Sequence, residues 1–317
     1  MTEAEFTAQY SDEWDRLERE ITAARFVEFD LPLAHLRLCE QLAYAEANAF
    51  SASLRARLNR IALAGHRRLY GQKRRSGWVV VYEFFAEKLP NSIYFYRFYL
   101  LLAAVIFVLP SFLGLTVGLV YPDIAALGHS EYVDMYDPAQ RNGSRLFDAD
   151  IYMFGYYILH NTSIGLRNIG GSLFFGIGGI VSLAYNGWEM GIVAALMMHE
   201  GFAAETFFPF VATHSAPELT AVVLSAAVGL ALAKAFLFPG RKLRRNSIKE
   251  ATVKLFPLLL FMVLLFFIAA FLEAFWSPRN ISRGLKYTVA GMVWFSLIWY
   301  FYYSLRRFVN CASSLSK

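Results

Sequence analysis

FYLLLAAVIFVLPSFLGLTVGLVYP, residues 98–122, is a run of 25 residues without a charged side chain. About 20 consecutive apolar residues are enough to cross the hydrocarbon core of a bilayer as an α-helix. The run therefore predicts a membrane span at about 98–121. Two further apolar segments, at about 253–273 and 287–305, predict spans of the same kind.

The composition of the whole chain agrees with a membrane protein. Of its 317 residues, 57% are hydrophobic and 17% are charged, and the 29 Phe outnumber the 25 Asp and Glu combined. Soluble domains could not bury so many large apolar side chains, and a disordered, collagen-like or disulfide-rich chain is excluded. The two cysteines form no metal or redox motif. The net charge of +5 comes from clusters beside the spans, so nucleic acid is not an expected partner.

The middle of the chain combines apolar residues with glycine and asparagine. Residues 168–188 carry no formal charge and contain six glycines, which would weaken a helix in water. In a membrane, small residues let helices approach closely, so spans buried in a bundle are expected at 151–167 and 169–186. A phosphate-binding loop is not indicated, because no strand precedes the glycines and no lysine follows. The glycines expected to pack helices are Gly170, Gly171, Gly176, Gly178, Gly179, Gly187 and Gly191.

The apolar piece at 190–198 is too short to span a bilayer. Together with the neighbouring residues through 212, it predicts a re-entrant or half-helix element at 188–212, which protein or water must cover. The next span is expected at 217–238, with Pro217 in its first turn. The prediction is thus an all-α polytopic bundle with about six spans in a membrane domain covering 97–309.

Basic residues after residue 238 predict the orientation of the bundle, because Lys and Arg mark cytoplasmic loops. An odd number of crossings from the acidic loop at 121–150 to this cluster gives six spans with both chain ends, including the tail 310–317, in the cytoplasm. One conflict remains, since Arg279, Arg283 and Lys286 then lie in a short outer loop. The cluster expected at the membrane surface is Arg241, Lys242, Arg244 and Arg245.

Residues 1–96 predict a cytoplasmic domain of amphipathic helices, and the acidic start has no apolar stretch typical of a signal peptide. Residues 1–50 hold eleven acids against four bases, whereas residues 51–78 hold eight bases and no acid. Two interpretations remain open. The two halves pair as an antiparallel hairpin, or the basic stretch lies on anionic lipid headgroups.

Ionisable and polar residues within membrane-embedded sequence are rare and costly, so they are candidates for function. His214 and Glu218 are one helical turn apart, so the carboxylate could fix the imidazole tautomer. The alternative is structural, with Glu218 favouring the positive end of a helix dipole. The candidate polar cluster is His160, Asn161, Asn168, Asn186, His199, Glu200, Glu205, His214 and Glu218.

No complete catalytic or metal motif is present. His199 begins HEGFAAE, but Ala203 stands where a zincin protease has its second histidine. A metal would therefore need His214, Glu205 or His160 from elsewhere. None of the serines lies in a GxSxG motif. We accordingly predict no catalytic residue, no bound metal and no cofactor.

Two segments resemble a known family. NTSIGLRNIGGSLFFGIGGIVSLAYNGWEMG, residues 161–191, and THSAPELTA, residues 213–221, are similar to the signature of the stage II sporulation protein M family over roughly residues 90–275. Two positions depart from the family pattern: Ser215 replaces a usual glycine, and Thr162 replaces a frequent second asparagine. The matching positions are Asn161, Asn168, Gly176, Asn186, Gly187, Gly191, His214, Glu218, Leu219 and Ala221.

The resemblance implies a bacterial inner-membrane protein of an envelope complex. Sporulation members act with peptidoglycan-degrading partners, and relatives are often encoded near an AAA+ ATPase and von Willebrand factor A-type proteins. The leading hypothesis is a non-enzymatic scaffold that forms a homo-oligomer in the lipid bilayer. A transporter or channel that uses Glu200, Glu205, His214 and Glu218 is the alternative, and an intramembrane metal-dependent hydrolase is the third.

Overall fold

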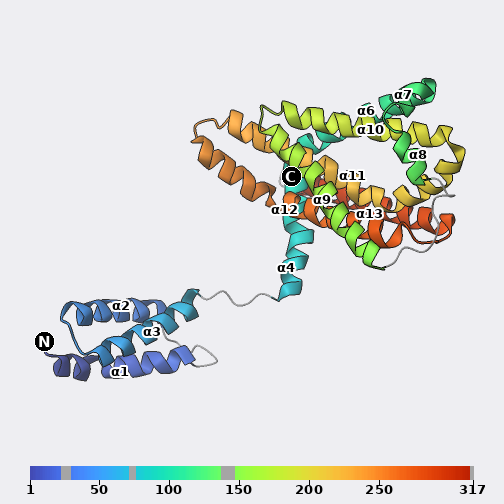
Figure 1. The fold of residues 1–317 in the computed structure, drawn as a ribbon. Helices are drawn as coiled ribbons and strands as arrows, with labels where there is room; N and C mark the ends of the chain where they lie inside the picture. The colour runs from blue at the N-terminus through green and yellow to red at the C-terminus, as the bar shows by residue number, and fades with distance from the viewer. Residues whose placement is uncertain (23–29, 71–75, 137–146, 315–317) are drawn as a thin grey trace. The chain divides into compact units, whose positions relative to one another are not determined.

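The computed structural model describes residues 1–22, 30–70, 76–136 and 147–314, and every regular element in those ranges is helical. This agrees with the all-α prediction. The chain divides into two compact units, Met1–Val80 and Val81–Lys317, which we describe separately (Figure 1).

The first unit packs three helices side by side around one apolar core (Figure 1). Trp14 and Leu58 are both almost fully buried in this core, as expected for the apolar faces of amphipathic helices. Trp14 also satisfies its indole N–H, which donates to Oε1 of Gln41 at 2.7 Å. The helices are α1 (Glu3–Thr22), α2 (Leu31–Ala47) and α3 (Ala52–Tyr70).

Opposite charges pair within this unit. Arg57 of α3 forms ion pairs with Asp15 and Glu18 of α1, as the hairpin interpretation of the charge division requires. At the other end of α1, Ser51 donates its hydroxyl and its backbone N–H to Glu3. These hydrogen bonds hold the pKa of Glu3 below its usual value, because they favour the ionised carboxylate. The basic residues Lys73, Arg74 and Arg75 lie outside the described residues.

The second unit, Val81–Lys317, is called the membrane unit below. Its boundary differs from the predicted domain limit at residue 96, because the helices just before the first span pack onto the spans. Ile93 is fully buried, and Ser92 donates its hydroxyl to the carbonyl of Lys254 at 2.8 Å. Tyr300 donates to the carbonyl of Phe85, also at 2.8 Å. The helices that pack in this way are the π-helix η1 (Phe84–Lys88) and α5 (Leu89–Phe95). They follow α4 (Gly77–Glu83), which buries no side chain and contains the boundary between the two units.

Long helices make up the rest of the membrane unit (Figure 1). By length and composition, four helices among the described residues could cross a membrane: α6, α10, residues 204–237 of α11, and α12 with η3. The helices are α6 (Arg97–Val120), α7 (Pro122–Ala126), α8 (Ser130–Tyr136), α9 (Phe147–Ser172), α10 (Ile177–His199), α11 (Gly201–Leu237), α12 (Arg244–Phe271), the π-helix η3 (Leu272–Trp276) and α13 (Arg283–Ser314).

The helix boundaries between 169 and 217 differ from those expected. The predicted span at 169–186 is interrupted by a turn that contains Gly176, whose φ of 82° is costly for any residue with a Cβ. The expected re-entrant element at 188–212 is not a separate element. Its first part continues α10 and its second part begins α11, because the chain breaks at Glu200. The helix expected to start at Pro217 begins at Gly201 and continues through both of its prolines.

Close backbone contact joins α6 to α10. A Cβ at Gly187 would collide with the carbonyl of Phe107, and one at Gly191 with the carbonyl of Ser111. Farther along, a Cβ at Gly118 would lie 2.6 Å from the Cβ of Ala195. Since residue numbers rise together along both helices, α6 and α10 run parallel.

The other glycines predicted to pack helices have different roles. Gly171 and Gly178 approach one another across the turn between α9 and α10, and a Cβ at Gly179 would collide with Ser172. Gly170 differs, because a Cβ there would meet nothing within 4 Å. The prediction of close packing is therefore wrong for Gly170, which lies on an open side of α9.

Candidate functional site

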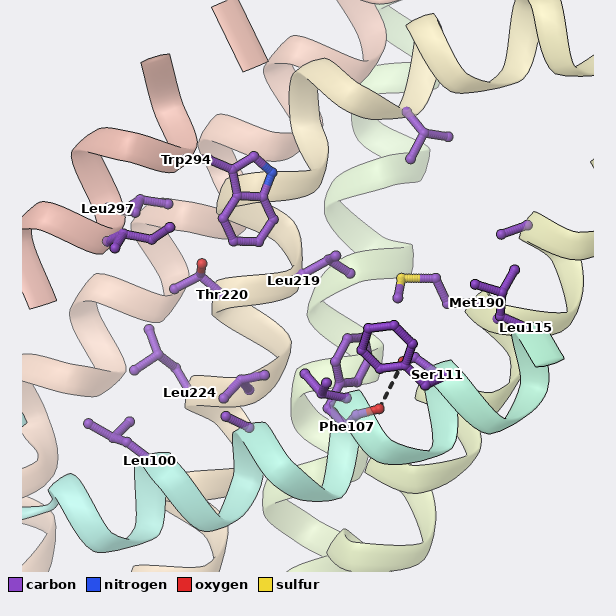
Figure 2. A pocket seen from close by; sticks show the side chains of 18 of the residues that line it. Leu100, Phe107, Ser111, Leu115, Met190, Leu219, Thr220, Leu224, Trp294 and Leu297 are labelled. Atoms are coloured by element: carbon purple, nitrogen blue, oxygen red, sulfur yellow. Dashed lines mark hydrogen bonds between the residues drawn. The ribbon is translucent and has the colours of Figure 1, made fainter. Parts of the chain in front are cut away.

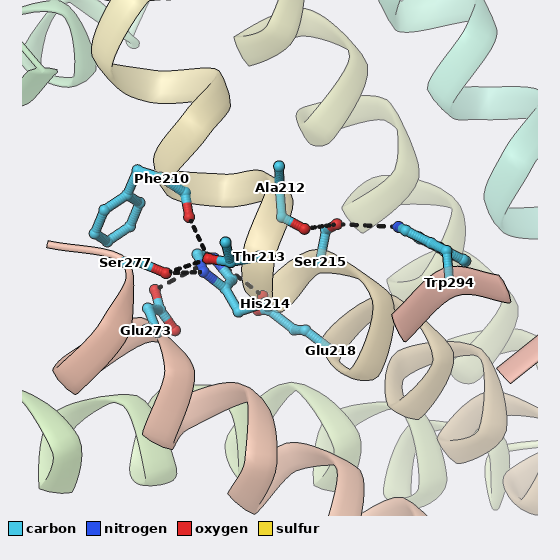
Figure 3. Close-up of polar contacts among 9 residues, drawn as sticks. All are labelled: Phe210, Ala212, Thr213, His214, Ser215, Glu218, Glu273, Ser277 and Trp294. Carbon is cyan, nitrogen blue, oxygen red and sulfur yellow. Dashed lines mark hydrogen bonds and ion pairs between the residues drawn. The ribbon is translucent and has the colours of Figure 1, made fainter. Parts of the chain in front are cut away.

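Three ionisable side chains meet where α11 passes η3 (Figure 3). Nε2 of His214 lies 3.8 Å from Oε2 of Glu218 and 4.0 Å from Oε1 of Glu273. The imidazole is almost fully buried, and the side chains of Glu218 and Glu273 are 21% and 13% exposed. We call His214, Glu218 and Glu273 the His–Glu–Glu cluster.

The local backbone of α11 and η3 explains how the three side chains of the cluster are positioned. His214 and Glu218 share a face of α11 because they are four residues apart. Glu273 lies in η3, where the backbone bonding changes to a π-helical pattern and the N–H of Ser277 donates to the carbonyl of Leu272 at 2.7 Å. Single π-helical turns inside α-helices are frequent at functional sites.

Hydroxyl groups hold the imidazole from the opposite side. Nδ1 of His214 lies 3.0 Å from Oγ of Ser277, and that oxygen lies 2.6 Å from Oγ1 of Thr213. The Thr213 hydroxyl donates to the carbonyl of Phe210 at 3.2 Å. Glu218, which the sequence suggested could fix the imidazole tautomer, lies on the Nε2 side of the ring, whereas the shorter contact of the ring is from Nδ1 to Ser277.

Asn161 of α9 adds an amide to the cluster. Its side chain contacts the carboxyl group of Glu273, and its Oδ1 and Nδ2 have no other hydrogen-bond partner among the described residues. Oε2 of Glu273 is also buried without a partner. Buried polar atoms are almost always hydrogen-bonded, so these atoms need an explanation.

Asn168, farther along α9, forms a second and fully satisfied polar contact. Its amide donates to Oγ of Ser225 at 2.9 Å and accepts from Oγ of Ser182 at 2.7 Å. The residue is fully buried, so it links α9 to both α10 and α11. This network matches the structural role of asparagine in a helix bundle.

The remaining predicted residues lie outside the His–Glu–Glu cluster. His199 bonds to the carbonyl of Gly118, and Asn186 donates to the carbonyl of Ser182 within its own helix. Glu205 pairs with Arg283 at 2.7 Å, where both side chains are exposed. His160 is exposed and stacks on Tyr156, and Glu200 lies at the C-terminal cap of α10.

The basic residues that conflicted with the predicted topology have local partners. Arg279 forms an ion pair with the fully buried Asp150, and Arg283 pairs with Glu205. Lys286 is buried and donates to the carbonyl of Ser277 at 2.7 Å. Two of the three bases therefore pair with acids of the same unit, Asp150 and Glu205.

Sequence reasoning missed Glu273 and Ser277. Both follow an apolar span, where a carboxylate and a hydroxyl look like the start of a surface loop. A signal was nevertheless present, because α11 and α12 are joined by a connection of only six residues, 238–243. Two antiparallel helices bring residues roughly equally distant from their connection side by side, which places residues near 267, within two helical turns of Glu273, opposite His214.

A second feature is an open-sided apolar groove on the same unit (Figure 2). Its volume is about 690 Å³, and it is lined by α6, α10, α11 and α13. Two of the lining residues, Phe112 and Ile298, are large and exposed. Others are small, among them Ala104, Gly191 and Ala194. Trp294 borders the groove and donates to Oγ of Ser215, so the serine that departs from the family pattern links α11 to α13.

The fold and the site define a helical membrane protein with a polar cluster buried between its helices. A family model described as Stage II sporulation protein M matches residues 98–278, and the chain belongs to this family. A second model, a domain of unknown function designated DUF8413, matches residues 4–71. No curated protein and no solved structure matches the chain.

Proposed function

We propose that this protein is a non-enzymatic membrane scaffold that assembles as a homo-oligomer in a bacterial envelope complex. The observation that carries the proposal is the apolar groove on the membrane unit. In lipid, an apolar groove with small residues favours a packed helix, because small residues allow close backbone approach. The occupant we propose is a transmembrane helix of a second copy.

The proposed arrangement has six spans: α6, α9, α10, α11, α12 with η3, and α13. The parallel packing of α6 and α10 supports a crossing between them, and α9, with 26 residues, is long enough to supply it. For α13, Arg283 pairs with Glu205 near its start and Arg307 bonds the carbonyl of Ala86 near its end. Such contacts fit a helix that runs the full depth of the bundle.

The proposed orientation places both chain ends in the cytoplasm of a bacterium, with the protein in the inner membrane. The connection after α11 supports it, because Arg241, Lys242, Arg244 and Arg245 are all exposed. By family resemblance, the complex would include an AAA+ ATPase or peptidoglycan-remodelling proteins.

The transporter alternative is less well supported. It required Glu200, Glu205, His214 and Glu218 to line one polar path, but Glu205 pairs with Arg283 at an exposed position away from His214. The groove is apolar, so it does not suit a polar solute. We therefore favour assembly over transport.

Cysteine cross-linking in membranes tests the assembly proposal. With Cys39 and Cys311 replaced by serine, a cysteine at Ile298 should give a covalent dimer on oxidation, since this residue lines the groove and is 61% exposed. The matched control is a cysteine at Val263, which is 54% exposed and outside the groove. Equal cross-linking at both positions, or a strictly monomeric mass in mild detergent at every concentration, would exclude the proposal.

A further inference from the structure

The His–Glu–Glu cluster points three hydrogen-bond acceptors at a common centre. One ligand atom from each of His214, Glu218 and Glu273 lies within 4.8 Å of the others. Figure 3 shows the imidazole of His214 close to both carboxyl groups and to the Ser277 hydroxyl. Such an arrangement is unfavourable unless protons or a cation lie between the acceptors.

The hydrogen-bond chain admits an arrangement in which Nδ1 of His214 carries the proton. In this arrangement the Thr213 hydroxyl donates to the carbonyl of Phe210, so Oγ1 of Thr213 accepts from Ser277. Ser277 has then used its own proton and must accept from Nδ1–H of His214. Nε2 is left with its lone pair directed toward Glu218 and Glu273, which is the state in which histidine binds a metal.

Independent evidence for a ligand comes from Asn161. Asn161 is 1% exposed and its side chain contacts Glu273 from α9, but neither amide atom has another hydrogen-bond partner among the described residues. Oε2 of Glu273 likewise has none. Lys286 approaches the cluster from α13, but the contact that places it there is to the backbone carbonyl of Ser277. Atoms that could bind a ligand are therefore present on α9 and on η3, in addition to those on α11.

We propose that His214, Glu218 and Glu273 bind one divalent transition-metal ion, with zinc as the best match. One imidazole and two carboxylates are ligands typical of zinc, and three protein ligands leave a fourth position for water or the Asn161 amide. Ligands about 2.1 Å from a tetrahedral ion lie roughly 3.4 Å apart, so the present separations of 3.8 and 4.0 Å need only small side-chain shifts. This binding site is independent of the proposed assembly role.

Zinc content of the full-length protein in lipid nanodiscs tests the site. After loading with zinc sulfate and desalting, the unaltered chain should retain about one zinc per chain. Glu273→Gln should reduce retention at least about 10-fold, since it removes a ligand without changing side-chain size. The matched controls His199→Gln and Glu205→Gln, which alter a histidine and a glutamate outside the cluster, should retain as much zinc as the unaltered chain.

Two further measurements separate metal binding from folding. Zinc should raise the melting temperature of the unaltered chain and leave that of Glu273→Gln unchanged, because only a bound ligand stabilises the folded state. Cobalt in place of zinc should give the intense visible absorption of a tetrahedral site, and Ser277→Ala should weaken its binding by about 10-fold while keeping the spectrum. Should Glu273→Gln fail to fold, Glu218→Gln takes its place.

Zinc retention by the Glu273→Gln or Glu218→Gln variant equal to that of the unaltered chain would overturn the proposal. So would an unaltered chain that neither retains zinc nor shows the cobalt spectrum, in which case protons rather than a metal would neutralise the cluster.

Discussion

The membrane unit joins its helices in two different ways. Between α6 and α10, Gly187 and Gly191 bring backbones into direct contact. Between α9, α11 and η3, the contact is polar and includes Asn161, His214 and Glu273. We call these the glycine contact and the polar contact.

The difference between the two contacts suggests that the glycine contact has a structural role, whereas the polar contact can also bind a ligand. Lipid is as apolar as a leucine side chain, so helices in a membrane need close packing or hydrogen bonds to associate. The glycine contact meets this need mainly through close packing of the two backbones. The polar contact has buried atoms without partners, so it is the place where a ligand would bind.

The largest expected effect is at the glycine contact. Gly191→Ala should destabilise the protein by about 3 kcal/mol, because the added Cβ would collide with the carbonyl of Ser111 in the neighbouring backbone. The measurement is thermal unfolding in detergent. Gly170→Ala is the matched control and should stabilise by about 0.5 kcal/mol, since that position is open. Similar losses for both variants would show that the close approach of Ser111 to Gly191 does not determine the stability of the glycine contact.

A smaller effect is expected where an ion pair joins α9 to the chain after η3. Arg279→Ala should cost about 2 kcal/mol, because it leaves the fully buried Asp150 with an unpaired charge, partly offset by solvent access at the arginine. Arg283→Ala, which breaks an exposed pair with Glu205, should cost under about 0.5 kcal/mol. Equal unfolding temperatures for the two variants would show that burial of Asp150 is unimportant.

The smallest effect concerns the satisfied asparagine. Asn168→Ala should cost about 1 kcal/mol, because Ser182 and Ser225 lose their partner between helices. The control Asn186→Ala removes only a bond within its own helix and should change the unfolding temperature little. A larger loss for Asn186 than for Asn168 would contradict the assignment of Asn168 to the bundle core.

Hydropathy alone predicted the most apolar helices well. The expected span at 98–121 differs from α6 by one residue at each end. The middle failed because the prediction ended helices at charges and began them at prolines. Glu189 lies inside α10, where His129 pairs with it at 2.8 Å, and Pro209 and Pro217 lie inside α11.

The sequence predicted only the part of the site that lies within one helix. His214 and Glu218 are neighbours in sequence, so helical periodicity paired them. Glu273 reaches them through the packing of α12 against α11, and no local pattern encodes that contact. The unmet hydrogen bonds of Asn161 become visible only when all three elements are in place.

The parallel glycine contact also has a consequence for synthesis. The ribosome makes α6 well before α10, and the intervening chain from Val120 to Ile177 takes on the order of several seconds to translate. During that interval Gly114 and Gly118 have no partner helix. Insertion of this protein therefore requires the membrane machinery to tolerate, or to shield, an unpaired first span until its neighbour arrives.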